Sequence, residues 1–451
     1  MMLPIIVRWP LPVKRFVIRS LSTGHQGPSP EVTSGKLRDA FANATKGLSN
    51  HVQTIRAQQL EPAKEPVRMD IQARVAASAS VPVSDDKPTL YIPGSPPRLT
   101  TSKVPFRLLN EPVGRRRKSF LLDNTLYPAL RAMNPRYDLS KIDVVCSTWF
   151  FTRLFWFVSL GRQKTVQRIR IQLIKNTIVL SELALSEFIG KEGKSVESLH
   201  RLFSTPEDNI PSDARYFRFL ECKIGGLAFI IRAKVDAWNP DLGHSLATTS
   251  VDAAHTDPEG TRDEDLKNHD TKKSTEPDEW TIVQAGSPVP ISASINWRFR
   301  HYGDNPQQRY NRYLQSWLSQ TFSNFSGVLA FENQHLRQSS LKNYETFMQT
   351  WIKDHEDELR KTCALLEMLR DAAQRSRHGI LIASIGNPYA KKEDQTIELY
   401  EPEFDADILD EEKVPEFLRV KKDMLSESTI QQFWYDNARA QGTSTTSEAS
   451  L

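Results

Sequence analysis

The sequence predicts one α+β domain, in which a mostly antiparallel or mixed central sheet is flanked by helices. The apolar fraction of 39% over 451 residues is enough for one sizeable core. Two alternating segments have the length and the central turn of β-hairpins, and segments of helical periodicity precede and follow them. Helices followed by antiparallel strands and further helices are typical of the α+β class.

The elements before the first hairpin are a short strand and two helices. We expect order to begin at residues 87–99, where TLYI predicts a strand and PGSPP predicts a rigid turn. Helical spacing follows from Tyr127. It returns in the apolar run before residue 160, where Ser147 or Thr148 can cap the helix.

Two hairpins form the centre of the predicted sheet. Residues 168–183 alternate and contain β-branched side chains, with a turn at Lys175-Asn176. Residues 216–238 alternate in the same way around Gly225-Gly226, a dipeptide that favours tight hairpin turns. Strand character resumes at 281–300.

Helices return in the last third of the ordered chain. One is predicted at 307–322, and a long one at 341–376, where apolar residues recur at helical spacing. A final strand is predicted at 379–384. We expect the strands that contain Ile231, Val235 and Ile295 to share one sheet, with the helix that holds Trp317 packed against it.

Polar or biased composition marks segments outside this domain. The first thirty residues are basic and free of acids, which is the composition of a mitochondrial transit peptide, although nuclear or cytoplasmic localisation is the alternative. The predicted organisation is a transit peptide at 1–30, a disordered linker at 31–88, one domain formed by 89–243 and 280–390, a disordered acidic insert at 244–279 and a largely disordered acidic tail at 391–451.

Charge is unevenly distributed along the chain. The net charge of +4 includes +4 from residues 1–30, −6 from residues 245–280 and −8 from residues 391–451, which leaves +14 for the rest. A basic domain with acidic appendages is compatible with RNA or another polyanion as partner. Solvated surface charge around a flexible acidic tail is the alternative interpretation.

Several classes of site are excluded by spacing. The three cysteines are far apart and odd in number, and the histidines are scattered, which argues against a disulfide framework and against zinc sites. The most apolar run, residues 149–160, contains Arg153 and is too short to span a membrane. We therefore expect no membrane span and no bound cofactor.

Five segments resemble one family of uncharacterised fungal proteins, which are often labelled geranylgeranyl pyrophosphate synthetase. The segments are LYIPGSPP at 90–97, DLSKIDVVCSTWFFTRLFWFV at 138–158, GGLAFIIRAKVDAW at 225–238, VPISASINWRFR at 289–300 and LQSWLSQTFSNF at 314–325. The DDxxD motif of prenyl diphosphate synthases is missing, and the hairpins do not suit their all-helical fold. A prenyl diphosphate synthase is therefore the least favoured function.

That fungal family is in turn similar to the DXO-type decapping exonucleases, a branch of the PD-(D/E)XK nuclease fold. The resemblance implies acidic residues at the ends of two strands, a lysine beside the second acid, and a helix that carries a basic residue and a W-x-x-Q-like motif. Such carboxylates hold Mg²⁺, which activates water, and the lysine offsets charge on the attacked phosphate.

This sequence departs from that pattern at several positions. Where the family has Glu-x-Asp, this chain has Lys234 before Asp236, so that only the second acid is kept. Asn296 and Arg298 replace the metal carboxylate and the lysine of the second strand. Gln320 is kept after Trp317, but Gln315 stands where a basic residue is expected. An amide oxygen binds Mg²⁺ far less well than a carboxylate, so the resemblance implies a degenerate site.

The leading hypothesis is therefore a catalytically degenerate nuclease-fold protein that binds RNA or another polyanion, or that scaffolds a protein partner. Lys234 either lies on the opposite strand face or turns inward, where its charge opposes a metal ion. The residues expected to bind substrate phosphates are Lys234, Arg298, Arg300, Arg115, Arg116 and Arg117. The alternative is an active Mg²⁺-dependent nuclease that takes its acids from Glu182, Glu187 or Glu221. A further alternative is that these residues occupy ordinary strand and helix positions and have no binding role.

Overall fold

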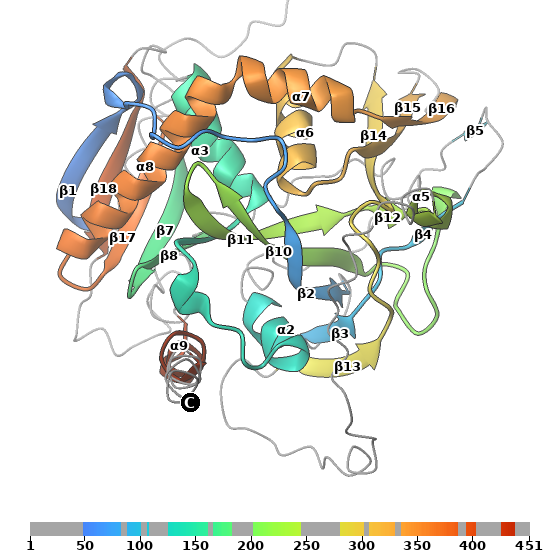
Figure 1. Ribbon diagram of the computed structural model, residues 1–451, viewed down its shortest axis with the longest axis horizontal. Helices are drawn as coiled ribbons and strands as arrows, with labels where there is room; N and C mark the ends of the chain where they lie inside the picture. Colours follow the sequence, from blue (N-terminus) through green and yellow to red (C-terminus); the bar gives the residue numbers. More distant parts are fainter. Residues whose placement is uncertain are drawn as a thin grey trace, which may run out of the picture. The chain divides into compact units, whose positions relative to one another are not determined.

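Two β-sheets form the framework of the described chain (Figure 1). The structure is a computed structural model, and it describes residues 48–82, 88–100, 106–107, 125–160, 166–182, 202–244, 280–301, 306–329, 335–386, 394–402 and 425–437. All of these residues lie in one compact unit, Gly47–Leu451. The sequence interpretations of residues 1–30 as a transit peptide and of most of the acidic insert lie outside the described residues.

The larger sheet has eleven described strands in the order β1-β18-β17-β7-β8-β6-β11-β10-β2-β3-β13. Their bounds are β1 Leu48–Arg56, β2 Arg74–Val81, β3 Thr89–Pro93, β6 Val144–Ser147, β7 Gln167–Ile174, β8 Thr177–Glu182, β10 Arg215–Ile224, β11 Leu227–Val235, β13 Thr281–Ala285, β17 Ile380–Ile385 and β18 Thr396–Pro402. Most neighbours are antiparallel, whereas β6 runs parallel to both β8 and β11. The predicted mixed, mostly antiparallel sheet is thus confirmed.

The second sheet has seven described strands in the order β5-β16-β15-β14-β12-β4-β9. Their bounds are β4 Arg98–Leu99, β5 Phe106–Arg107, β9 Ser204–Thr205, β12 Ala237–Trp238, β14 Ser294–His301, β15 Ser323–Leu329 and β16 His335–Asn343. The prediction that Ile231, Val235 and Ile295 share one sheet was therefore wrong. The chain leaves the larger sheet after Val235 and enters the smaller one at Ala237, which pairs with Ile295.

Both predicted hairpins are present with their predicted turns. Strands β7 and β8 pair up to Ile174 and Thr177, and β10 pairs with β11 up to the two central glycines. Gly225 and Gly226 have φ of 55° and 85°, the left-handed backbone that a type I′ turn requires at both central positions. A side chain at Gly225 would also collide with the sulfur of Cys363 on a covering helix.

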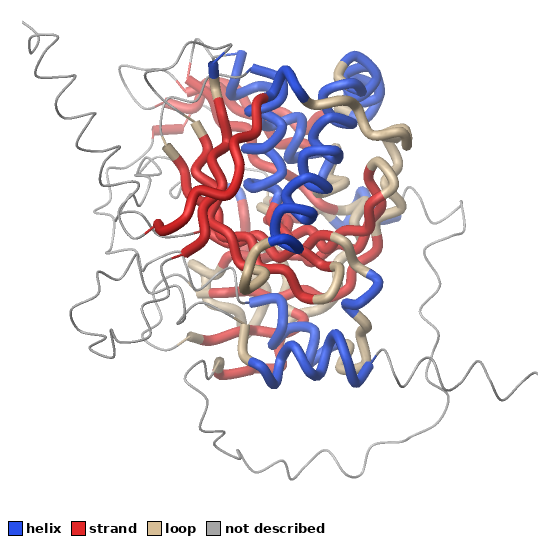
Figure 2. Tube along the Cα trace, turned by 90° about the vertical axis from the view of Figure 1, so that its left-hand side faces the viewer, coloured by secondary structure: helices blue, strands red, loops and turns tan. Residues whose placement is uncertain are grey.

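Helices cover both faces of the larger sheet (Figure 2). On one face lie α3 Thr148–Leu160, α6 Pro306–Leu318, α7 Glu345–Asp354 and α8 Glu356–Arg375. On the other lie α2 Leu126–Met133, the turn η3 Leu139–Lys141 and a C-terminal helix formed by α9 Glu427–Ile430 and η6 Gln431–Asp436. The helix that holds Trp317 packs against the larger sheet as predicted, since its indole contacts Phe151 of α3 within the core that includes Phe229 of β11. No helix among the described residues is long and apolar enough to cross a membrane.

The structure departs from the sequence predictions in three other places. The predicted helix 341–376 is the end of strand β16 followed by two helices that meet at His355, whose φ of −119° interrupts the helical backbone. Within the supposed linker 31–88, strands β1 and β2 are built into the larger sheet. Within the supposed tail 391–451, strand β18 pairs with β1 and β17, and a helix follows at Glu427.

Candidate functional site

Asp236 lies at the point where the chain passes from one sheet to the other. It follows β11 directly and precedes β12, and its carboxylate Oδ2 accepts the backbone N–H of Trp297 in β14 at 2.9 Å. The indole N–H of Trp297 donates in return to the backbone carbonyl of Asp236 at 3.2 Å. The carboxylate therefore ties the two sheets together at this junction.

Lys234 turns toward Asp236. Residues two apart on a strand share a face, so of the two alternatives for Lys234 the inward orientation is the one that the structure shows. Its ammonium Nζ lies 2.8 Å from Asp236 Oδ1, with the lysine side chain 37% exposed and the carboxylate only 16% exposed. Both carboxylate oxygens thus have partners, one a cation and the other a backbone N–H.

Asn296 and Arg298 lie on the adjoining strand β14, where side chains two apart also share a face. The buried amide of Asn296 donates to the carbonyl of Thr321 at 3.2 Å and to Ser316 Oγ at 3.4 Å. Arg298 donates to Asn324 Oδ1 at 2.6 Å, to the carbonyl of Arg312 at 2.8 Å and to the same Ser316 hydroxyl. The structure therefore brings Asn296 and Arg298 against helix α6, and Asp236 binds the backbone of Trp297, the residue between them.

The pKa of Arg298 is lowered to about 10. Burial is the main cause, because it disfavours the charged form, and the negative charge of Asp236 opposes this effect. The guanidinium nevertheless keeps its charge at pH 7. Its hydrogen bonds to Asn324, Arg312 and Ser316 link strand β14 to β15 and to α6.

Gln320 ends helix α6. Its φ is +50°, its N–H donates to Trp317 O, and the N–H of Thr321 donates to Ser316 O, a pair of bonds that defines a Schellman helix end. Its side-chain amide donates to the carbonyls of Trp317 at 2.7 Å and Met69 at 3.3 Å. Its described contacts cap the helix, a role that the sequence analysis did not predict for this residue.

The donor set at this junction does not fit a divalent cation. Mg²⁺ and Mn²⁺ are held by converging carboxylate or carbonyl oxygens, whereas position 296 supplies an amide in place of a carboxylate and Lys234 supplies a positive charge. Asp236 is the only carboxylate of the four mapped residues. Within the part of the chain that the structure describes, no group of three or more His, Cys, Asp or Glu side chains could hold a metal ion.

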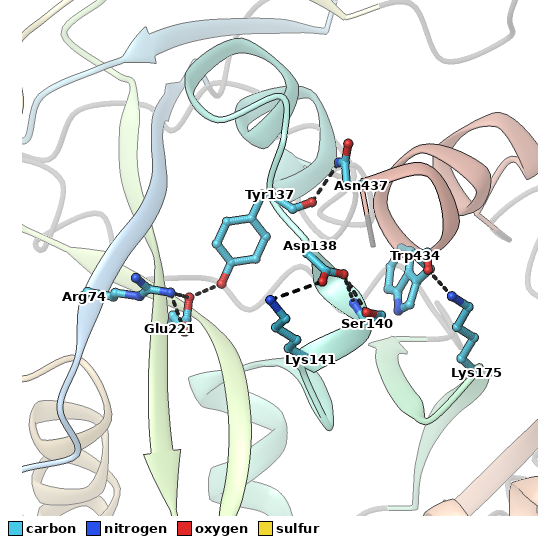
Figure 3. Close-up of polar contacts among 9 residues, drawn as sticks. All are labelled: Arg74, Tyr137, Asp138, Ser140, Lys141, Lys175, Glu221, Trp434 and Asn437. Carbon is cyan, nitrogen blue, oxygen red and sulfur yellow. Dashed lines mark hydrogen bonds and ion pairs between the residues drawn. The ribbon is translucent and has the colours of Figure 1, made fainter. Parts of the chain in front are cut away.

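The alternative acids and the remaining basic residues are distributed elsewhere. Glu221 lies on β10, where Arg74 pairs with both of its oxygens at 2.8 and 2.7 Å and the hydroxyl of Tyr137 donates to it (Figure 3). Burial and the carboxylate raise the pKa of Tyr137 well above its usual value, so the phenol stays a donor. The backbones of Glu182 and Arg300 lie in β8 and β14, while Glu187, Arg115, Arg116 and Arg117 lie outside the described residues.

A second basic site, which the sequence analysis missed, lies on the face of the larger sheet that carries α2. It is a small recess with a cavity volume of about 30 Å³. Its polar lining consists of Ser147, Arg170, Gln172, Ser181 and Arg232, and its apolar lining includes Tyr127, Phe219 and Leu425. Period-two alternation in RIRIQLI places Arg168, Arg170 and Gln172 on one strand face, which is the signal that could have found it.

Buried thiols are a further feature of the sheet. All three cysteines are free and buried, and burial raises the pKa of Cys146 and of Cys363 to about 12 and that of Cys222 well above 9. Because only the thiolate is nucleophilic, burial and the raised pKa of Cys146 both keep its thiol unreactive at pH 8. We expect native protein to react with a thiol reagent far more slowly than urea-unfolded protein, in which all three thiols should react. Rapid labelling of the native protein would contradict this.

The fold is shared with Rai1. Scheffersomyces stipitis Rai1 in complex with (3'-NADP)+ and calcium ion matches at a TM-score of 0.52 and 10% identity, covering 84% of this chain and 99% of that one. A second structure of Scheffersomyces stipitis Rai1 matches at 0.50 and 10%, with 85% and 98% coverage. Candida albicans Rai1 in complex with pU5-Mn2+ matches at 0.48 and 8%, with 78% and 94% coverage. The resemblance to the DXO-type nucleases is thereby confirmed at the level of fold.

Sequence comparison identifies the family to which the chain belongs. No curated protein matches the chain. One family description, Domain of unknown function (DUF8563), matches residues 50–421, which includes most of both sheets and every mapped site residue that the structure describes. This protein belongs to the DUF8563 family.

Proposed function

We propose that this protein is a nuclease-fold protein that binds RNA or another polyanion without metal-dependent cleavage. The observation that carries the proposal is the ion pair between Lys234 and Asp236 at 2.8 Å. An ammonium group pairs with the one carboxylate that the mapped site keeps, and the amide of Asn296 stands where the resemblance implies the second acid. Scaffolding of a protein partner is the second form of the proposal.

Binding is supported by charge. Outside the basic N-terminal and the two acidic segments, the chain carries a net charge of +14. Such charge attracts a phosphate backbone, and the resulting affinity falls with salt because bound counterions are released on binding. For three or four phosphate contacts to a single strand, the logarithm of the affinity should fall with a slope of about −2 to −3 against the logarithm of salt concentration.

The test uses 5′-labelled single-stranded RNA. We expect salt-sensitive binding that is the same in EDTA as in Mg²⁺ or Mn²⁺, and we expect the RNA to stay intact. Asp236→Asn should tighten binding severalfold, because it leaves the charge of Lys234 unneutralised, whereas the same change in a working nuclease would abolish cleavage. Metal-dependent shortening of the RNA would establish the active-nuclease alternative, and turnover of isopentenyl diphosphate would establish a prenyl synthase.

We also propose that residues 1–30 direct the protein to mitochondria, since they are basic and contain no acid. A fluorescent fusion of the full chain should co-localise with mitochondria, and deletion of the first 25 or so residues should release it to the cytoplasm. A nuclear or cytoplasmic signal that the deletion leaves unchanged would refute this.

A further inference from the structure

We infer that strand β13 is the interface of a twofold symmetric dimer, in which β13 of one copy of this chain pairs antiparallel with β13 of a second copy. Strand β13 is the last strand of the larger sheet and lies at its margin beside β3 (Figure 1). Its outer side pairs with no strand in the part of the chain that the structure describes. This assembly is independent of RNA binding and of the junction between the sheets.

The backbone of β13 shows which groups are open to a further strand. The N–H of Thr281 donates to the carbonyl of Pro88, and the carbonyl of Ala285 accepts the N–H of the residue after β3, both at 2.9 Å. Successive residues of a strand direct their N–H and C=O groups to opposite sides, so Ile282 and Gln284 direct theirs outward. Neither residue has a hydrogen bond to another described segment on that side. Two N–H and two C=O groups are therefore presented at this edge.

The other described sheet edges carry the features that normally prevent pairing, which are short strands, bulges and charged residues. Strand β1 has a register shift on each side of His51 and ends in Arg56. Strands β5 and β9 have two residues each. Strand β16, which β5 covers only at its start, carries the exposed Lys342. Strand β13 has none of these features.

The side chains of β13 suit pairing with an identical strand. Its sequence, TIVQA, contains no charge and no proline, so two copies bring no like charges together. Ile282 is 39% exposed, which is unusual for an isoleucine. It pairs with the buried Leu90 of β3 and therefore lies on the face of the sheet that α2 covers. A twofold axis perpendicular to the sheet would place Ile282 of both copies on that same face.

The outward groups determine the register of the dimer. In an antiparallel pair, two residues opposite each other exchange both of their hydrogen bonds. Ile282 would pair in this way with Gln284 of the second copy, and Gln284 with Ile282 of the second copy, which gives four bonds. Val283 would then face Val283 of the second copy at the twofold axis, in a pair that makes no hydrogen bonds.

The charge of the neighbouring sequence favours antiparallel over parallel pairing. An acidic segment with a net charge of −6 ends just before β13. Parallel pairing would bring both acidic segments to the same end of the interface. In the antiparallel register, the two Thr281 residues lie about 14 Å apart, well beyond the screening length of about 8 Å at physiological salt. The two acidic segments then enter from opposite ends.

The dimer should be reversible, because the interface is small. Interfaces below about 1,200 Å² are typical of weak and transient association, and two five-residue strands lie at this low end. We therefore expect a dissociation constant in about the micromolar range.

The experiment measures the mass of the full chain by sedimentation equilibrium at about 1 to 200 µM. We expect a reversible equilibrium between monomer and dimer. Ile282→Lys should raise the dissociation constant at least about tenfold, because each copy then brings a like charge to the interface. Phe347→Lys introduces the same charge at an exposed apolar residue of helix α7 and should leave the dissociation constant within about twofold.

A second variant tests the backbone bonds. Gln284→Pro removes an outward N–H from each copy, and with it two of the four bonds between the strands. It should also raise the dissociation constant at least about tenfold. The pairing with β3 should be kept, because an edge strand tolerates proline where the missing N–H faces solvent. The melting temperature of the dilute protein should therefore stay near that of the wild type.

Cross-linking tests the register. Val283→Cys should form a covalent dimer on mild oxidation, because the two Cα atoms of such a pair lie about 4.5 Å apart. Thr281→Cys is the matched control and should stay monomeric, because its Cα atoms exceed the limit of about 7 Å for a disulfide. The three native cysteines are free and buried, so they should not contribute.

Three results would overturn the inference. One is protein that stays monomeric over the whole concentration range. The second is a dimer that neither Ile282→Lys nor Gln284→Pro weakens, since it would use another surface. The third is equal cross-linking at positions 281 and 283.

Discussion

Trp434→Ala should lower the free energy of unfolding by about 3–5 kcal/mol, the usual cost of deleting a buried aromatic side chain. Phe433 and Trp434 are both fully buried, although they lie close to the C-terminus of the described chain. The Trp434 ring lies 6.1 Å from that of Tyr127 on α2, and its indole N–H donates to Thr177 Oγ1 at 2.9 Å. The variant leaves both a cavity and a buried hydroxyl that has lost this donor.

Polar contacts hold the same helix on the sheet. Lys175 donates to the carbonyl of Trp434, and Asn437 donates to the carbonyl of Tyr137 at 2.9 Å (Figure 3). Tyr435→Ala is the matched control, because this neighbouring side chain is 37% exposed and the variant should cost much less. Urea midpoints of the two variants decide the matter. If Trp434→Ala unfolds at the same urea concentration as Tyr435→Ala, the buried indole does not contribute to the stability of the sheet.

This helix shows why part of the fold could not be predicted from the sequence. Hydrophobic periodicity identified both hairpins and helix α3, because each is a long segment whose own residues carry the pattern. The C-terminal helix is short and lies in a segment of net charge −8, so the composition of the segment hid a few buried aromatic residues. Strands β1 and β18 pair with each other across most of the chain, a long-range contact that no local pattern reveals.

The positions of the candidate site residues could be predicted from the sequence, but their contacts could not. The resemblance to the DXO-type nucleases implied that Asp236, Asn296 and Arg298 lie near one another, and the structure brings them together at the junction of the sheets. The sequence did not indicate that Asp236 would accept the N–H of Trp297, nor that Gln320 would cap its helix with a left-handed backbone. Such contacts depend on where the chain changes sheets, which is decided by packing of the whole domain.

The double variant Lys234→Glu with Asn296→Asp should bind Mg²⁺ measurably at the junction, where we propose that the wild type holds no metal, because converging carboxylates are the ligands that Mg²⁺ prefers. The lysine change removes the ammonium 2.8 Å from Asp236 and adds a carboxylate on the same face. The asparagine change replaces an amide with a metal-binding acid next to helix α6. Arg298 stays nearby and limits the gain, because its charge opposes a cation.

The melting temperature of the double variant should also report metal binding. Without metal, three carboxylates repel one another, and the carboxylate introduced at position 296 can no longer donate to the carbonyl of Thr321, so the double variant should melt below the wild type in EDTA. Mg²⁺ or Mn²⁺ should recover most of that loss, since a ligand that binds only the folded state stabilises it. Calorimetry should show metal-binding heat for the double variant alone.

The matched control is Lys234→Gln with Asn296→Ala, which removes the same ammonium and amide without adding an acid. It should be destabilised in EDTA, and metal should not rescue it. If the carboxylate variant also shows no heat and no rescue, the assignment of Lys234 and Asn296 to the metal positions of the nuclease fold is wrong. If wild-type protein itself shows metal binding and metal-dependent stabilisation, the ion pair between Lys234 and Asp236 does not exclude a cation, and the proposal of a non-cleaving protein loses its basis.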